Sequence, residues 1–317
     1  MVVTQNSATQ QHVQGLLQSA GTSLDCVHFV QVPVRSKWIR DYGPVAIKTV
    51  NRDWALLDAD YFDNSLLAIS PHEDRLPTLL AQRLGLQSIR VPLGIQHGNL
   101  LSNGQGLYVT TRKLLEDNAA RGYDAKSVDQ VLKRYYGAKE VVLLDNLIGE
   151  PTGHVDMFAT FTSANTIVVG SFELRDDPEN AAILDRNAAH LAATFTADGP
   201  LRVVRIPMPR KRRSGAGPLL WATYTNVTYA NQILLVPVCQ GSNADEANAA
   251  INVYRQLLPD WRIVRIDATP LMQQFGSLRC ATMNLGSVGA LRLASLRGSG
   301  ERVSAREQQT FSFRGMP

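Results

Sequence analysis

The sequence of 317 residues is poor in cysteine and in long apolar runs. Its three cysteines, Cys26, Cys239 and Cys280, lie far apart, so the sequence predicts neither a disulfide framework nor a cysteine-based metal site. No apolar run approaches the ~20 residues that a membrane-spanning helix needs, and the first residues lack the basic start and apolar stretch of a signal peptide. We therefore expect a soluble, cytoplasmic protein without a membrane partner.

Charge is also sparse: the formal net charge is +4, with 19% charged and 44% hydrophobic residues, a balance typical of a globular protein. The one dense basic cluster, residues 209–213, precedes a segment rich in glycine, serine and proline, residues 214–218, which predicts a loop. Aromatic residues are not interleaved with the cluster, so a solvated loop is favoured over a nucleic-acid partner. A loop that screens an acidic pocket or contacts an acidic partner is the alternative.

Five times along the chain a helical pattern is followed by a strand pattern. The predicted helices are 9–20, 76–84, 127–136, 179–195 and 245–258, and the strands that follow them are 27–33, 88–92, 140–144, 201–207 and 261–266. Successive strands are separated by about 50–60 residues, the regularity of an internal repeat. Because no single unit can bury its apolar face alone, we expect five α/β units packed in a ring. An open doubly wound sheet is the alternative.

A polar stretch follows each of these strands, and in a ring the polar stretches would converge on one centre. The side chains that they would bring together are Asp41, Asn99, His154, Asp156, Asn226 and Cys280. His154 and Asp156 would share one face if the segment 152–158 is extended. Cys280 lies in a loop-like sequence, whereas Cys26 and Cys239 adjoin predicted strands, so Cys280 is the candidate nucleophile.

Two carboxylates in a confined pocket need a cation, and the planar guanidinium group satisfies them with its fork of N–H donors. A thiolate nearby could attack the electron-poor guanidinium carbon. The imidazole could protonate the departing ammonia and then activate water. This set of residues therefore favours hydrolysis of a guanidino group to a ureido group, a reaction that needs no metal and no organic cofactor.

Four segments carry a resemblance to a known family: residues 38–44 (Trp-Ile-Arg-Asp-Tyr-Gly-Pro), 153–156 (Gly-His-Val-Asp), 224–226 (Tyr-Thr-Asn) and 276–282 (Gly-Ser-Leu-Arg-Cys-Ala-Thr). Together they resemble the agmatine deiminases and the bacterial, Porphyromonas-type peptidyl-arginine deiminases, over residues 27–285. The resemblance implies the pentein fold, an α/β-propeller of five ββαβ-type modules around a pseudo-fivefold axis. It implies one domain over residues 1–317, with 288–317 as a C-terminal extension.

The resemblance also implies roles for individual residues. Cys280 would be the nucleophile and His154 the acid and base, while Asp41 and Asp156 would bind the guanidinium. Further substrate contacts would come from Asn226, Trp38 and Asn99, with Trp38 in the pocket wall or in the core.

The sequence departs from the family pattern at several residues, among them Asn103, which stands where the family commonly has aspartate. Gln96 stands where the family commonly has glutamate, His97 follows it in place of a glycine, and Arg279 stands where the family often has histidine. Because these changes make the site less negative, the sequence does not determine which group the substrate carries at the end remote from its guanidinium.

The leading prediction is a cysteine-dependent deiminase that forms a covalent thiouronium intermediate. Its substrate would be agmatine, an arginine-like small molecule or the arginine side chain of a peptide, and a homodimer is an open alternative to a monomer. Two rival functions stay open: an amidinotransferase of the same fold, in which an amine takes the amidino group, and a guanidine-binding protein without catalysis.

Overall fold

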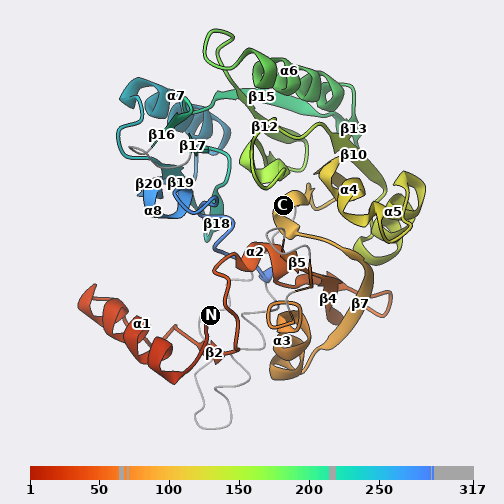
Figure 1. Cartoon of the computed structure of the whole chain (residues 1–317), viewed down its shortest axis with the longest axis vertical. Coiled ribbons are helices and arrows are strands. Elements are labelled where there is room, and N and C mark those ends of the chain that lie inside the picture. Colours follow the sequence, from red (N-terminus) through yellow and green to blue (C-terminus); the bar gives the residue numbers. More distant parts are fainter. Residues whose placement is uncertain (64–67, 70, 214–218, 287, 289–317) are drawn as a thin grey trace. The chain divides into compact units, whose positions relative to one another are not determined.

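The computed structural model of the protein describes residues 1–63, 68–69, 71–213, 219–286 and 288. These residues form two compact units, drawn in Figure 1. The first unit contains residues 1–92 and the described residues from Met283 onward, and the second contains residues 93–282. The expected C-terminal extension 288–317 lies, apart from Val288, outside the described residues.

The predicted helices and the strands that follow them are present and confirmed. The helices are α1 (Ser7–Ser19), α3 (Leu76–Leu84), α5 (Ala125–Val131), α6 (Pro178–Ala192) and α7 (Ala244–Leu257), followed by the strands β2 (Phe29–Gln31), β7 (Gln87–Gly94), β10 (Glu140–Leu144), β15 (Arg202–Pro207) and β20 (Arg262–Asp267). The helix predicted over 127–136 changes from α5 to a π-helical turn, η2 (Leu132–Tyr136).

Each of these strands joins a small sheet. Among the described residues, four sheets have three strands, and in each of them a hairpin precedes the helix and the third strand. The hairpins are β3 (Val45–Lys48) with β4 (Trp54–Asp60), β8 (Leu101–Ser102) with β9 (Leu107–Thr111), β11 (Ala159–Ser163) with β12 (Thr166–Ser171), and β18 (Thr228–Ala230) with β19 (Ile233–Val238). The third strand runs parallel to the second in the pairs β9–β10, β12–β15 and β19–β20.

The N-terminal sheet is smaller, because β1 (Val2–Thr4) pairs directly with β2 in parallel and α1 connects them. The chain thus has the mixed α/β organisation that the repeat predicted, whereas closure of the modules into a fivefold ring stays a prediction. The remaining short elements are α2 (Ile39–Tyr42), β5 (Phe62–Asp63), β6 (Ala68–Ile69), η1 (His97–Asn99), α4 (Lys113–Ala119), η3 (Val155–Met157), β13 (Phe195–Thr196), β14 (Gly199–Pro200), β16 (Arg212–Arg213), β17 (Leu219–Leu220) and α8 (Thr269–Met272).

Apolar helix faces cover these sheets within each unit. In the second unit, α6 packs on β12 and β15, and α7 packs on β15 and β20 (Figure 1). The first five residues of β12 are all buried, as expected for the central strand of a covered sheet. In the first unit, α3 packs on β4 and ends at Gly85, whose left-handed φ of 61° suits a glycine at a helix C-terminus. In the part of the chain that the structure describes, no helix is both long and apolar enough to cross a membrane.

The segment 38–44 forms a single tight turn in the first unit. The helix α2 carries Asp41, which is buried, and Gly43 follows as its C-cap. A Cβ atom added at Gly43 would lie 2.5 Å from the carbonyl oxygen of Ile39. The turn therefore closes only because residue 43 has no side chain, which explains the glycine of this segment.

We expect Gly43→Ala to lower the free energy of unfolding by about 1–3 kcal/mol, because a backbone atom must move to make room for the methyl group. Denaturant unfolding measures the change. Gly15→Ala is the matched control, since its Cβ on α1 meets nothing within 4 Å and a helical alanine is favoured over glycine. A Gly43→Ala protein as stable as the Gly15→Ala protein would contradict this account of the turn.

Candidate active site

The predicted site residues other than Cys280 occupy equivalent places in their modules. In the second unit, the 3-10 helices η1 and η3 and the segment 223–227 each lie directly before the first strand of a hairpin, β8, β11 and β18. In the first unit, α2 lies in the same place before β3. The helices η1 and η3 contact one another, so two of these segments meet within the second unit.

The side chain of His154 is buried and contacts a residue of the preceding module. Its Nε2 atom lies 2.9 Å from the Oε1 atom of Gln96, an amide oxygen that accepts the ring proton. The pKa of His154 is lowered to about 3, first because burial disfavours the charged ring and then because of the positive charges of Arg279 and Lys113. His154 is therefore neutral near pH 7 and able to accept a proton.

The prediction of an extended segment over residues 152–158 is wrong. His154 itself is extended, with φ −82° and ψ 140°, but Val155–Met157 forms the 3-10 helix η3, and the strand β11 begins only at Ala159. The chain turns here because the carbonyl groups of His154 and Val155 accept hydrogen bonds from Met157 and Phe158. His154 and Asp156 are thus presented by a turn and not by alternate positions of a strand.

Asp156 forms an ion pair with a residue of this same chain. The Nη1 atom of Arg279 lies 2.7 Å from Oδ2 of Asp156, whose side chain is fully buried, while that of Arg279 is 14% exposed. The same guanidinium donates to the carbonyl oxygens of His97, Gly98 and Leu100. The carboxylate that sequence reasoning assigned to the substrate therefore already binds a guanidinium group.

Cys280 and Asn226 contact each other in the second unit. The Nδ2 atom of Asn226 lies 3.3 Å from Sγ of Cys280, and the amide oxygen of Asn226 accepts hydrogen bonds from the backbone N–H groups of Arg279 and Cys280, at 2.9 and 3.3 Å. Both Asn226 and Cys280 are buried. Asn226 therefore fixes the backbone that carries the thiol, in addition to contacting the thiol itself.

Asn99 holds two loops together. Its Oδ1 atom accepts hydrogen bonds from the backbone N–H groups of Thr111 and Val155 and from the hydroxyl of Thr111, at 3.0–3.1 Å. The oxygen of the same hydroxyl lies 2.7 Å from the carbonyl oxygen of Gly153, so its single hydrogen is shared between Gly153 and Asn99. Asn99 thus ties η1 to the start of η3, a structural task beside the substrate contact that the resemblance implies.

Glu150 is a functional candidate that sequence reasoning did not single out. Its buried carboxylate accepts hydrogen bonds from the backbone N–H groups of Thr152 and Gly153, the latter at 2.6 Å, and from the Thr152 hydroxyl. In turn the Thr152 hydroxyl accepts from the N–H of His154. The only sequence feature that could have indicated Glu150 is its position four residues before His154, with Thr152 and Gly153 between them. Glu150 organises the loop that presents His154.

Gly153 in this loop has a left-handed φ of 67°, a conformation that favours glycine. The side chain of Lys113 packs against it, within 3.3 Å of where a Cβ atom would lie. Lys113 itself pairs with Asp117 of its own helix, α4.

Asp41 and Trp38 belong to the first unit, and their contribution to the site stays a prediction. Asp41 is buried and Trp38 is half-buried. The Nζ atom of Lys37 lies 4.9 Å from the centre of the Trp38 ring. Among the described residues, no group of three or more His, Cys, Asp or Glu side chains is placed to hold a metal ion.

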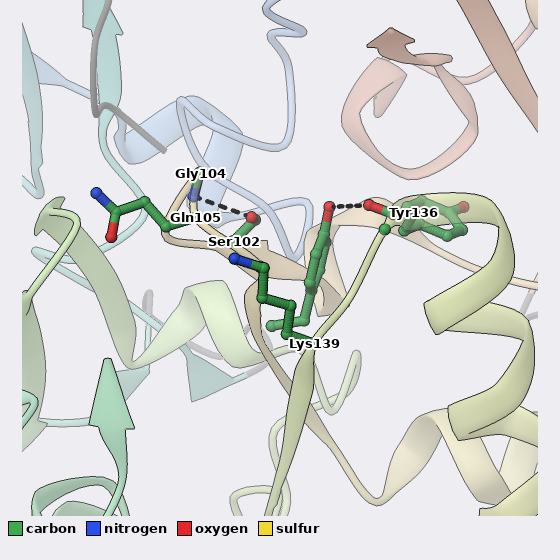
Figure 2. Close-up of a pocket in the computed structure, with 8 residues that line it drawn as sticks. Ser102, Gly104, Gln105, Tyr136 and Lys139 are labelled. Atoms are coloured by element: carbon green, nitrogen blue, oxygen red, sulfur yellow. Dashed lines mark hydrogen bonds between the residues drawn. The ribbon is translucent and has the colours of Figure 1, made fainter. Parts of the chain in front are cut away.

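A hollow of about 330 Å³ lies away from these residues, at the end of the β8–β9 hairpin. Figure 2 shows Lys139 and Tyr136 at this hollow, with Ser102 accepting a hydrogen bond from the N–H of Gly104. None of the predicted site residues lines it. Tyr136 is nevertheless a link to the site, because its hydroxyl lies 2.9 Å from Nε2 of His97 in η1.

The titration of Glu150 gives a testable pH dependence. Burial, the largest cause, raises its pKa to about 7, against the opposing hydrogen bonds from Thr152 and Gly153. Between the ordinary value near 4.5 and about 7 the folded protein holds a proton that the unfolded chain has lost. The free energy of unfolding should therefore fall by about 1–3 kcal/mol as the pH rises through this window, and level off above it.

Glu150→Gln should flatten this part of the profile, as measured by urea unfolding at several pH values between 4.5 and 7.5. Glu140→Gln, which removes an exposed carboxylate, is the matched control and should leave the profile unchanged. An unaltered slope in the Glu150→Gln protein would show that another group titrates there.

Comparisons with known proteins show the family and the fold of this chain. The model of the Porphyromonas-type peptidyl-arginine deiminase family matches residues 1–285. A Legionella pneumophila protein named "Putative agmatine deiminase" is 26% identical over 263 residues, which cover 81% of this chain and 74% of that protein.

Two solved structures share the mixed α/β fold. The crystal structure named "Putative Arginine Deiminase" from Porphyromonas gingivalis has a TM-score of 0.78 at 26% identity and covers 89% of this chain and 83% of its own. The C. jejuni agmatine deiminase has a TM-score of 0.74 at 23% identity, and the match covers 89% of this chain and 80% of that protein. At this identity the similarity shows the fold of this chain and nothing further. The chain therefore belongs to the Porphyromonas-type peptidyl-arginine deiminase family, a family of hydrolases that act on C–N bonds in linear amidines.

Proposed function

We propose that this protein is a cysteine-dependent deiminase that hydrolyses a guanidino group to a ureido group and ammonia, with Cys280 as nucleophile. The observation that carries the proposal is the ion pair in which the carboxylate of Asp156 binds the guanidinium of Arg279 at 2.7 Å. Arg279 directly precedes Cys280 in the sequence. A carboxylate and main-chain carbonyls that accept this group from Arg279 have the chemistry that a guanidino substrate requires. The family assignment supports the same reaction class.

In the proposed reaction, Asp41 and Asp156 hold the guanidinium of the substrate, while Oδ2 of Asp156 keeps its ion pair with Arg279. Sγ of Cys280 attacks the guanidinium carbon of the substrate. His154, which is neutral because its pKa is about 3, takes the proton of the thiol. A C–N bond then breaks, and the departing amine takes that proton and leaves as ammonia.

The remaining species is a thiouronium, in which the carbon is bonded to Sγ of Cys280. His154 removes a proton from water, whose oxygen attacks this carbon. The C–S bond breaks, the thiolate regains a proton, and the ureido product leaves. Asn226, which fixes the backbone of Cys280 and contacts its Sγ, keeps the nucleophile in one position through both steps.

We also infer that the modules close into a five-bladed propeller, which would bring Asp41 to the same centre as Cys280. Support comes from the equivalent place of α2, η1, η3 and the segment 223–227, each directly before the first strand of a hairpin. Agmatine, arginine-like small molecules and peptidyl arginine are the candidate substrates, and an assay of turnover on each of them distinguishes them.

Cys280→Ala should lose at least about 10³-fold in kcat, measured as ammonia and ureido product from agmatine, free arginine and an arginine peptide. Cys239→Ala, which removes a second buried thiol, is the matched control and should retain activity. Ammonia release without an amine acceptor excludes an amidinotransferase. Unchanged turnover in the Cys280→Ala protein would overturn the proposal, and no turnover by the unaltered protein would favour the non-catalytic alternative.

A further inference from the structure

His154 is held at two points within the second unit. Its ring atom Nε2 lies 2.9 Å from Oε1 of Gln96. Its backbone N–H donates to the hydroxyl of Thr152, which is itself bound by the carboxylate of Glu150. The first contact fixes the ring and the second fixes the backbone that carries it. The proposed reaction uses His154 and gives no role to Gln96.

The fold sets the distance between Gln96 and His154. Gln96 directly precedes η1, and its carbonyl accepts a hydrogen bond from the N–H of Asn99 at 2.8 Å. The side chain of Asn99 in turn accepts from the N–H of Val155, the residue after His154. The backbone segments that carry the amide and the imidazole are therefore tied together next to the point where the two side chains meet.

The contact with Gln96 selects one form of the neutral ring. An amide oxygen accepts hydrogen bonds and donates none, so Nε2 of His154 carries the ring hydrogen. In a neutral imidazole the lone pair is then on Nδ1. With the hydrogen on Nδ1 instead, Nε2 and Oε1 would face each other as two acceptors. The tautomer decides which ring atom can take the proton of the thiol.

The charged groups that act on the ring from other elements are cations. They are Arg279, next to the thiol of Cys280, and Lys113 of α4. His97 of η1 lies close in the chain, but its Nε2 atom contacts the hydroxyl of Tyr136. Both cations disfavour a positive charge on His154, as does its burial.

The acidic groups beside His154 oppose these cations only weakly. Asp156 is already paired with Arg279 at 2.7 Å. Burial raises the pKa of Glu150 to about 7, so at neutral pH this carboxyl is only partly ionised. Gln96 supplies a hydrogen-bond acceptor at the ring without supplying a negative charge. The imidazolium therefore has no counter-ion at the atom where its ring is held.

On the basis of the proposed function, we propose that Gln96 is a positioning residue that holds His154 with its hydrogen on Nε2 and keeps the ring uncharged in the resting enzyme. The reaction then starts from a thiol and a neutral imidazole. Nδ1 takes the proton as the S–H bond breaks and the bond from sulfur to carbon forms, and it gives that proton to the departing amine. A carboxylate at position 96 would hold the same tautomer but would favour the imidazolium. The amide therefore extends activity to more acidic pH.

The tautomer and charge of His154 can be measured by NMR without turnover. The sample is the full-length Cys280→Ala protein with 15N in its histidine rings, in which the thiol does not titrate alongside. His154→Asn in the same background identifies the signal among the six histidines. We expect the hydrogen on Nε2 and a ring that stays neutral down to about pH 5. A hydrogen on Nδ1, or a ring charged at about pH 6, would overturn the inference.

Gln96→Glu keeps the acceptor oxygen and adds a charge. In the Cys280→Ala background it should raise the pKa of His154 by about 1–3 pH units, because the carboxylate stabilises the imidazolium. In the protein with its thiol, the acidic limb of the pH profile of kcat/KM should move to higher pH. Gln130→Glu adds the same charge at an exposed position of α5 and, as the matched control, should change neither. An unmoved titration in the Gln96→Glu protein would contradict the proposed role of the amide.

Gln96→Met keeps the length of the side chain and removes the oxygen. Without this acceptor the ring loses its preference for one tautomer, so kcat should fall by at least about tenfold while KM changes little. Gln96→Glu, which retains the oxygen, should keep its turnover above its shifted acidic limb. A Gln96→Met protein with full kcat would mean that residue 96 only fills space.

The substrate for these profiles is whichever of agmatine, free arginine and an arginine peptide the unaltered protein converts. If a variant at position 96 does not fold, the tautomer and the titration of His154 in the Cys280→Ala protein decide. No ureido product from any of the three compounds would refute the proposed function. The ring measurements need no turnover, so a wrong tautomer refutes this inference alone.

Discussion

The buried pair of Asp156 and Arg279 is the interaction on which the site in the second unit depends. A fully buried carboxylate is tolerated only when a partner compensates the loss of water, and removing one partner of such a pair typically costs about 3–5 kcal/mol. Here the partner comes from 123 residues further along the chain and also binds three carbonyl groups, two in η1 and one directly after it. One guanidinium thus joins the segment of the thiol to both loops that surround His154.

Amide side chains complete this framework. Asn99 joins η1 to η3, and Asn226 holds the backbone at Cys280. Both amides are buried and use their oxygen for several N–H donors, so they hold loops that lack the regular hydrogen bonding of a helix or a sheet. The site is therefore made of irregular segments that are nonetheless well bonded, which is what a fixed catalytic geometry requires.

Much of the fold could be predicted, because each helix-and-strand pair has a strong apolar pattern of sufficient length. The strand β1, with three residues, is too short to give such a pattern. The turn η3 was taken for a strand because His154 and Asp156 are two residues apart, which is also the spacing of side chains on one face of a strand. The candidate site residues were proposed from residue type, spacing and the family resemblance, and their roles stay predictions. What sequence could not give was the partner of Arg279, since ion pairs between distant segments leave no local pattern, nor Glu150, whose importance comes from burial.

The way in which Asn226 holds the backbone gives the peptide at Cys280 a second support. The N–H groups of Arg279 and Cys280 are both bound by the amide of Asn226, whereas the side chain of Arg279 is bound by Asp156. Residue 279 is therefore held through its backbone and through its side chain by two different partners. A change of this side chain removes one of the two supports and leaves the sulfur atom of Cys280 in contact with Asn226.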